Sequence, residues 1–357
     1  MKDSLSRKIA LALMLATFAA PAALAHAGTD AGEELAARWT AVSASSEKSR
    51  ADIDRYNDTE EGRSELLSEL QQKDGVNDDW ELNRRVETIM TNLTAAIGSI
   101  DPTIYEKPYQ YFINTRDGFN AFCTLGHIMS INQGIFENLD DDSEIAVVLG
   151  HEMGHGQSNH PVDATRQALS VKSIVQSSGG SLDTLLAAAL VKNQYTKPME
   201  WAADNLAFAY ITHSYYNPGA TAAVWQRVID QYGENSSPFL AALSNHPASK
   251  DRRDNYERKI ESYANGHVSV TTDGVVMVDT QPFCIPAAAH GMSSHERAYL
   301  VEGNLAAAFH NGHSRSAAYA DGATVMLGAQ PIMTCVSGDE DAWTLADRLN
   351  QIKDGRR

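Results

Sequence analysis

The chain has 357 residues, of which 43% are hydrophobic and 21% are charged, and its formal net charge is −17 at pH 7. This length is ample for one large hydrophobic core and slightly long for a single domain. The acidic balance excludes nucleic acid as a predicted partner, because a protein that neutralises phosphates needs a surface rich in lysine and arginine.

Residues 1–25 have the features of a secretory signal peptide. Three basic residues precede an apolar run from Ile9 to Ala20, and residues 23–25, Ala-Leu-Ala, are typical of a cleavage site. The run is shorter than the roughly 20 apolar residues of a membrane span, and no later segment comes close, so we expect no transmembrane span in the mature chain. The predicted location is the periplasm, with secretion or an uncleaved N-terminal anchor as alternatives.

Residues 31–107 are expected to form an N-terminal helical segment. The stretch 31–73 is acidic, rich in Ala, Glu and Ser, and poor in apolar positions, which is typical of solvated helices that wrap around a core. Residues 79–97 place apolar side chains at helical intervals, which predicts a better amphipathic helix.

Residues 108–264 are predicted to combine a short sheet with a mainly helical core. Short β-type runs cover 109–114 and 128–131, with Gly118 and Gly126 as turn signals between them. Helices are predicted over residues 141–160, 162–177, 181–193, 198–214, 219–232 and 249–263.

Residues 266–357 change to a β-rich pattern, which predicts a small C-terminal α/β domain of unknown role. Strands are predicted at 268–272, 275–278 and 323–327, and helices at 294–310 and 341–352. No internal repeat with a solenoid period is visible. The predicted fold class is therefore α+β: a mainly helical core with a short sheet at its cleft, followed by the α/β domain. An envelope protein partner is considered for that domain.

Residues 151–155 read His-Glu-Met-Gly-His, an H-E-x-x-H pattern. On a helix, histidines at i and i+4 project from one face and can reach one metal ion. Zinc suits these ligands, and the glutamate after the first histidine can take a proton from the attacking water. The pattern predicts one Zn²⁺ per chain, held by His151 and His155, with Glu152 as the catalytic base.

Glu200 is the candidate third ligand that a catalytic zinc site normally requires. It lies four residues before Asp204, and this spacing puts both carboxylates on one helical face. Asp204 would then accept a hydrogen bond from a ligand histidine. The alternative interpretation is a solvated acidic face with no role in metal binding. All proposed ligands precede Gly266, so the C-terminal domain is expected to be dispensable for zinc chemistry.

Several short motifs follow one another in a fixed order between Gln110 and Tyr263. They are Asn120-Ala121-Phe122, Gly126, Asn132-Gln133-Gly134, the zinc helix, Glu200-x-x-Ala203-Asp204, Asn217-Pro218, and His246-Pro247 followed by Arg252. This order resembles the gluzincin family that contains the CAAX prenyl proteases, the HtpX heat-shock proteases and the soluble periplasmic proteases of the BepA type. Because no later membrane span is predicted, the chain is most similar to the BepA type. The resemblance implies a zinc endopeptidase in which Glu200 is the third ligand and Asp204 orients a histidine.

The resemblance also implies roles for residues around the metal. Asn120, Ala121 and Phe122 would form an edge strand to which an extended substrate adds, and an ordinary buried strand is the alternative. His246 would lie near the zinc as a donor to the developing oxyanion or as a removable ligand. Arg252 would pair with carboxylates or substrate carbonyls, and a plain surface arginine is the alternative.

Two positions depart from the family pattern. Gly126-His127 stands where the family usually has two glycines, and Cys123 stands where it usually has alanine. Both lie near the expected cleft, so the sequence leaves substrate preference open. His160 and His213 are expected to be structural or exposed.

The cysteines and the remaining motifs favour no competing chemistry. Cys284 and Cys335 are predicted to form one disulfide in an exported chain, leaving Cys123 free. A thiol protease built on Cys123 and His127 is disfavoured because no orienting third group is visible. The predicted function is hydrolysis of extended or unfolded proteins, by resemblance misfolded or mis-assembled envelope proteins. A zinc-stabilised binding or chaperone protein is the alternative.

Overall fold

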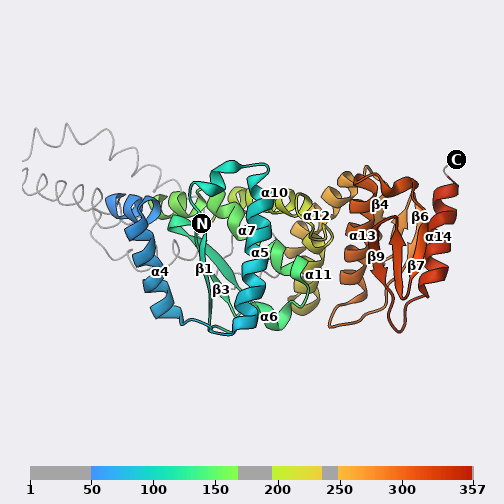
Figure 1. Ribbon diagram of the computed structural model, residues 1–357, viewed down its shortest axis with the longest axis horizontal. Coiled ribbons are helices and arrows are strands. Elements are labelled where there is room, and N and C mark those ends of the chain that lie inside the picture. The colour runs from blue at the N-terminus through green and yellow to red at the C-terminus, as the bar shows by residue number, and fades with distance from the viewer. Residues whose placement is uncertain (1–49, 168–194, 235–247, 356–357) are drawn as a thin grey trace, which may run out of the picture. The chain divides into compact units, whose positions relative to one another are not determined.

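The computed structural model describes residues 50–167, 195–234 and 248–355 (Figure 1). The predicted signal peptide, most of the two helices predicted after 160, and His246 lie outside these ranges. Helices dominate the described chain, and its strands form three small three-stranded sheets. The predicted α+β class is therefore confirmed. None of the helices in the described ranges is long and apolar enough to cross a membrane.

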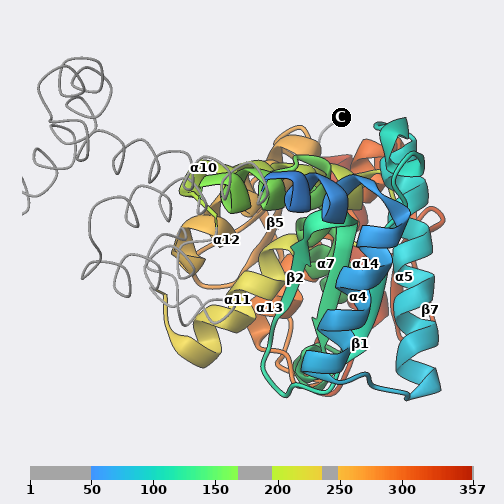
Figure 2. The ribbon, with the colours of Figure 1, turned by 90° about the vertical axis from the view of Figure 1, so that its left-hand side faces the viewer.

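Two helices lie near the start of the larger of the two compact regions of the chain, residues 54–165 and 191–357. Helix α4 (Glu60–Asp74) lies against strand β1, as Figure 2 shows. Helix α5 (Trp80–Gly98) begins at Asp79, whose side chain accepts hydrogen bonds from the amides that follow it. Its buried face packs against α7 and confirms the predicted amphipathic helix; this face consists of Val86, Ile89, Met90, Leu93, Ala96 and Ile97.

The first sheet has the strand order β1-β3-β2. Its strands are β1 (Gln110–Asn114), β2 (Ala121–Thr124) and β3 (Ile128–Asn132). Strand β3 pairs in parallel with β1 and antiparallel with β2, and it is buried along its whole length. Strand β2 is therefore an edge strand, and it packs beside α7.

Within the described ranges, residues 160–167 are also helical, and the helices whose bounds are fully described between the first sheet and the C-terminal strands lie close to the predicted positions wherever a helix was predicted. They are α6 (Gly134–Asn138), α7 (Asp142–Gln157), α10 (Lys197–Thr212), α11 (Ala220–Tyr232) and α12 (Ser249–Tyr263). Helix α7 is central because it contacts α5, α10, α11 and β2. Its residues 145–149 are almost fully buried, so this apolar run fixes the position of the H-E-x-x-H segment that directly follows.

The C-terminal part consists of two successive units, each with three antiparallel strands and a helix. The first contains β4 (Val268–Val270), β5 (Val276–Val278), β6 (Gln281–Cys284) and α13 (Ser294–His310). The second contains β7 (Ala318–Asp321), β8 (Thr324–Leu327), β9 (Gln330–Thr334) and α14 (Ala342–Asp354). The central strand of each unit has a register irregularity at the matching place. Strands β6, β7 and β9 are additions to the sequence prediction.

Helix α13 is buried on most of its circumference and shares one hydrophobic core with α11 and α12. A buried ion pair reinforces this contact, because Arg227 Nε donates to Glu296 Oε1 at 2.6 Å. Gly303 of α13 approaches so closely that a Cβ there would lie 2.0 Å from the Gly219 nitrogen. The α13 helix is thus tightly packed against the helical core.

The predicted disulfide is wrong, because Cys284 and Cys335 are both free thiols in the structure. Cys284 ends β6 of the first unit and is buried, whereas Cys335 follows β9 of the second unit and is partly exposed. The two cysteines therefore belong to different sheets. Cys123 is a third free thiol, fully buried in β2.

Candidate active site

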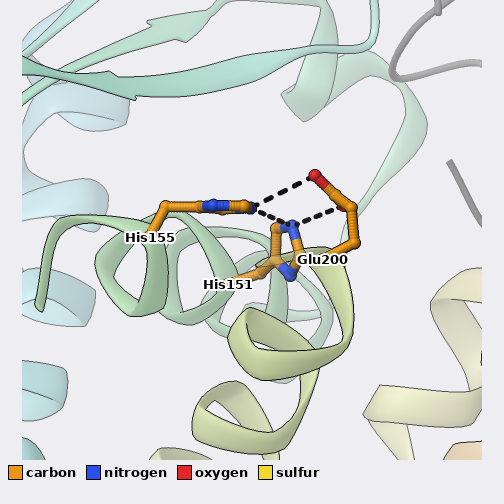
Figure 3. A group of neighbouring side chains, drawn as sticks. All are labelled: His151, His155 and Glu200. Carbon is orange, nitrogen blue, oxygen red and sulfur yellow. Dashed lines mark hydrogen bonds and ion pairs between the residues drawn. The ribbon is translucent and has the colours of Figure 1, made fainter. Parts of the chain in front are cut away.

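Three predicted metal ligands meet at one point between α7 and α10 (Figure 3). One ligand atom from each of His151, His155 and Glu200 lies within 4.8 Å of the other two. The Nε2 atoms of the two histidines are 3.1 Å apart, and they lie 3.5 Å and 3.4 Å from the Glu200 carboxylate. The i and i+4 spacing on α7 and the carboxylate from α10 therefore produce the arrangement expected from the sequence.

The two ligand-bearing helices approach closely because small residues line their contact. A Cβ at Gly154 would lie only 3.1 Å from the Ala203 carbonyl oxygen and 3.2 Å from its Cα. Such distances are shorter than ordinary side-chain packing allows, so the absence of a side chain at Gly154 is what permits this approach. His155 and Glu200 are each within a few residues of the contact.

Asp204 connects the ligand His151 to a buried arginine. His151 Nδ1 lies 3.0 Å from Asp204 Oδ1, which leaves Nε2 directed toward the other ligands. Arg252 Nε donates to Asp204 Oδ2 at 2.8 Å, and the Tyr256 hydroxyl donates to Oδ1 at 2.9 Å. Burial opposes ionisation of Asp204, but the Arg252 guanidinium and His151 outweigh it and lower the pKa of Asp204.

Arg252 is a buried part of the site, which rules out the alternative of a plain surface arginine. It is 3% exposed, and its guanidinium carbon lies 3.8 Å from the centroid of the Trp225 ring. This arrangement is a cation–π contact in a desolvated setting. The guanidinium therefore balances carboxylate charge while its stem and head are held by packing.

The donor set and charge of the site fit a divalent cation. Three buried carboxylates, those of Glu152, Glu200 and Asp204, face the cleft or its ligands, and the Arg252 guanidinium balances one of their charges. Burial lowers the pKa of His155 to about 3, so its imidazole is neutral and able to donate a lone pair. Two imidazoles and one carboxylate are a ligand set that catalytic zinc uses.

Glu152 occupies the place expected for a general base. Its carboxylate is buried, and Oε2 accepts a hydrogen bond of 3.0 Å from the backbone N–H of Cys123 in β2. Burial, with the nearby charge of Glu200 adding to the effect, raises the pKa of Glu152 to about 7. A carboxyl group with such a pKa can both accept and return a proton near neutral pH.

A cleft of about 140 Å³ joins these groups to the edge strand. Asn120, Ala121 and Phe122 line it opposite His151 and Glu152. Phe122 is half-buried, whereas the side chains of Ala121 and Cys123 turn into the core. The predicted edge-strand segment and the ligand cluster therefore border one cavity. The position of His246 is outside the described residues.

Two residues beside the ligands were missed by the sequence analysis. His160, expected to be structural or exposed, is buried, and its Nδ1 lies 2.9 Å from His155 Nδ1. The ring of Tyr195 stacks on His155 at a centroid distance of 4.0 Å. His127 is held away from the ligands, stacked on Tyr109 and bonded to the Lys107 carbonyl. Of these contacts, only the one between His155 and His160 joins residues that are close in the sequence, five positions apart, so only this contact could be suggested by local spacing.

The fold and the convergence of two histidines, a glutamate and a buried carboxylate base define a metalloprotease-type site. A family model described as "Peptidase family M48" matches residues 81–259, half of the chain. The chain belongs to peptidase family M48, a family of metalloproteases. The predicted family resemblance is thereby confirmed.

Similar proteins include two bacterial proteases and a mitochondrial one. "Metalloprotease LoiP" of Escherichia coli is 25% identical over 171 residues, covering 45% of this chain and 66% of its own length. The "Putative beta-barrel assembly-enhancing protease" of Vibrio cholerae is 23% identical over 210 residues, 54% of this chain and 42% of its own. "Mitochondrial metalloendopeptidase OMA1" of Schizosaccharomyces pombe is 28% identical over 151 residues, 40% of this chain and 43% of its own. The chain thus spans 66% or less of the length of each of these relatives.

Proposed function

We propose that this chain is a zinc-dependent endopeptidase that hydrolyses peptide bonds in extended or unfolded proteins. The observation that carries the proposal is the shared cleft, in which the His151, His155 and Glu200 cluster, the Glu152 carboxylate and the edge strand β2 lie together. A site that only stabilised the fold would have no use for a buried carboxylate base beside its ligands.

His151 Nε2, His155 Nε2 and the Glu200 carboxylate would hold the zinc. When bound, the ion supplies a Lewis acid that polarises the scissile carbonyl and acidifies the attacking water. Asp204 keeps a proton on His151 Nδ1, so that the Nε2 lone pair faces the ion. Arg252 holds Asp204 in its ionised form.

Glu152 takes the proton of the attacking water and passes it to the leaving amine. Its raised pKa of about 7 suits both transfers, because a general base is most effective when its pKa lies near the working pH. His246, by family resemblance, would steady the oxyanion or act as a removable ligand. An extended substrate would add to the edge of β2 at residues 120–122.

The proposed substrates are misfolded or mis-assembled envelope proteins, and the proposed location is the periplasm. The N-terminal segment supports export through its predicted signal peptide. One relative is named as a beta-barrel assembly-enhancing protease, which concerns an envelope process. An envelope protein bound by the C-terminal units remains part of this proposal.

The decisive test compares Glu152→Gln with the ligand variants His155→Ala and Glu200→Ala. Gln keeps the size and hydrogen-bonding reach of Glu152 but accepts no proton at neutral pH, so we expect one bound zinc and loss of casein cleavage. The ligand variants should lose both zinc and activity and melt at a lower temperature, because metal binding no longer stabilises the fold.

Zinc content, melting temperature and casein cleavage, with and without chelator, are measured on the same proteins. A zinc-stabilised binding protein, the competing function, predicts zinc binding without cleavage in the unmodified chain. A fully active Glu152→Gln protein would overturn the proposed mechanism even if zinc is required.

A further inference from the structure

The cleft-side edge of β2 offers few backbone groups to an incoming strand. Cys123 lies opposite Met129 in the antiparallel pair, and the Asn132 N–H donates to the Asn120 carbonyl at 2.9 Å. Opposite residues in such a pair alternate between hydrogen-bonded and non-hydrogen-bonded positions. Ala121 and Cys123 therefore direct their N–H and C=O groups away from β3, toward the open edge.

Both edge-facing groups of Cys123 already have partners within the protein. Its N–H donates to Glu152 Oε2 at 3.0 Å, and its carbonyl accepts a hydrogen bond from the Tyr195 hydroxyl at 3.0 Å. No described residue pairs with the edge-facing N–H and C=O of Ala121. Among the described residues, the open edge is thus occupied at Cys123 and has no partner two residues earlier, at Ala121.

The Tyr195 hydroxyl, which caps the Cys123 carbonyl, is held firmly in place. Tyr195 is 7% exposed, and its ring lies on the His155 imidazole at 4.0 Å with an interplanar angle of 16°. Moving the hydroxyl off Cys123 would require moving the ring from a proposed metal ligand. The cap therefore belongs to the ordered wall of the cleft, where a substrate would meet it.

We infer that Tyr195 is a positioning residue that sets the register of the substrate along β2, an inference that rests on the proposed endopeptidase function. An extended segment pairs with Ala121, and its pairing stops at Cys123 because Tyr195 and Glu152 already occupy both groups there. The substrate backbone must leave the strand at this point, which directs the next peptide bond toward Glu152 and the ligand cluster. Without the cap, a substrate could pair two residues further along.

The test is an N-methyl scan of one cleavable, fluorescently labelled peptide on the zinc-loaded full chain and on Tyr195→Phe. Phe keeps the ring that stacks on His155 but frees the Cys123 carbonyl. In the unmodified chain, methylation of one amide, that facing Ala121, should weaken binding about three- to tenfold, as expected for one lost hydrogen bond. In Tyr195→Phe, a second amide two residues away should become equally sensitive.

The matched control is Tyr210→Phe, which also removes a buried tyrosine hydroxyl, one that has no partner among the described residues. It should keep the pattern of the unmodified chain. Affinity is read by fluorescence anisotropy after zinc is removed with a chelator, so that the peptide is not cleaved during the titration, and turnover by kcat and KM on the zinc-loaded proteins. The inference is overturned if the second amide is already sensitive in the unmodified chain, or if it stays insensitive in Tyr195→Phe.

A third result would also overturn the inference. A hundredfold or larger fall in kcat with unchanged affinity would make Tyr195 a donor to the reacting oxygen instead. Failure of the proposed function looks different: the zinc-loaded chain would bind the peptides without cleaving them. In that case the anisotropy pattern still decides whether Tyr195 sets the register.

Discussion

Asp204 is the residue on which the charged network of the site converges. Asn at this position keeps the size but removes the charge, so His151 loses its orienting carboxylate and Arg252 loses its closest buried counter-charge. We expect the zinc dissociation constant of Asp204→Asn to rise about 10- to 100-fold. The free energy of unfolding should fall by about 3–5 kcal/mol, the typical result of breaking a buried ion pair.

Zinc competition titration and urea unfolding measure these two effects. Asp58→Asn is the control, because Asp58 is 57% exposed and pairs with Lys107 at the surface. Its loss should change stability by less than about 1 kcal/mol and leave zinc affinity unchanged. Equal zinc affinity in Asp204→Asn and the unmodified chain would rule out an orienting role for Asp204.

The burial of the Glu302 carboxyl predicts that the stability of the folded chain falls as the pH rises. This carboxyl is fully buried in α13, neither oxygen has a hydrogen-bond partner in the described structure, and burial raises its pKa well above the ordinary value, with Glu257 and Glu261 adding to the rise. The folded chain therefore keeps a proton that the unfolded chain releases above about pH 4.5. Stability must fall as pH rises from there toward the raised pKa of the folded state.

Glu302→Gln removes this titration while keeping the shape of the side chain. The variant should match the unmodified chain below about pH 4.5 and become more stable above it, by about 1.4 kcal/mol per pH unit. Chemical unfolding at several pH values measures the difference. Glu61→Gln, which changes an exposed carboxylate of α4, should show no such trend. Parallel curves for Glu302→Gln and the unmodified chain would contradict the assignment.

At the residue scale, the sequence predicts which side chains meet when these residues are close together in the chain. His151, His155 and Glu152 lie within one helical turn, so this group could be found from its own segment. The spacing of Glu200 and Asp204, by contrast, also fits a solvated acidic face, and the family resemblance favours the ligand role. The role of Tyr195 could not be found in this way, because its hydroxyl meets a carbonyl 72 positions earlier in the chain. Long-range contacts of this kind leave no periodic signal in the sequence.

At the scale of elements, the contact between α7 and α10 sets the distance between the ligands. Gly154→Ala would place a Cβ 3.1 Å from the Ala203 carbonyl and push the helices apart by a few tenths of an ångström. Overpacking of this kind costs about 1–3 kcal/mol, and it should also weaken zinc binding because His155 and Glu200 separate.

Gly150→Ala is the matched control one turn earlier on α7. A Cβ there would meet Leu93 at 3.8 Å, which is ordinary contact. The substitution should stabilise the chain by about 0.5–1 kcal/mol through helix propensity and leave zinc affinity unchanged. Thermal melting and zinc competition distinguish the two variants, and identical behaviour would show that the helix contact does not control the ligands.

The two C-terminal units show which strands could not be predicted from the sequence. Asp-Gly turns at 273–274 and 321–322 and Gln-Pro pairs at 281–282 and 330–331 recur in both units. Each third strand contains a proline, which is unusual inside a sheet and hides the strand from a periodicity search. The helices α13 and α14 were predicted because their apolar spacing is regular, but the duplicated topology emerges only from strand pairing.

At the scale of the whole molecule, the hydrophobic core crosses the sequence position where a domain boundary was predicted. Trp225 and Tyr256 of the helical core belong to the same buried cluster as Val301 and Leu305 of α13. The first two also contact the site, since Trp225 supports the Arg252 guanidinium and Tyr256 donates to Asp204. Packing of the C-terminal units is therefore coupled to the geometry around the proposed ligands.

This shared core argues that a chain ending at Asn265 will not behave as an independent zinc protein, in contrast to the sequence prediction. Truncation would expose Trp225, Val228, Tyr256 and Ile260, each of which stabilises a fold by about 1.5–3 kcal/mol when buried. A domain has only about 5–15 kcal/mol of stability in total. We expect the truncated chain to aggregate or melt without cooperativity and to bind zinc weakly.

Gly303→Ala in the full-length chain tests the same contact without exposing apolar surface, because its Cβ would collide with the backbone of Gly219. It should lower the melting temperature while the protein stays soluble, whereas Trp343→Ala, at an exposed position on α14, should not. Circular dichroism melts, size-exclusion chromatography and zinc content are compared for the unmodified chain, the two variants and the chain ending at Asn265. A soluble, cooperatively melting chain of residues 1–265 with one zinc bound would instead establish the helical core as a separate domain, because its apolar face would then tolerate water without loss of the ligand geometry.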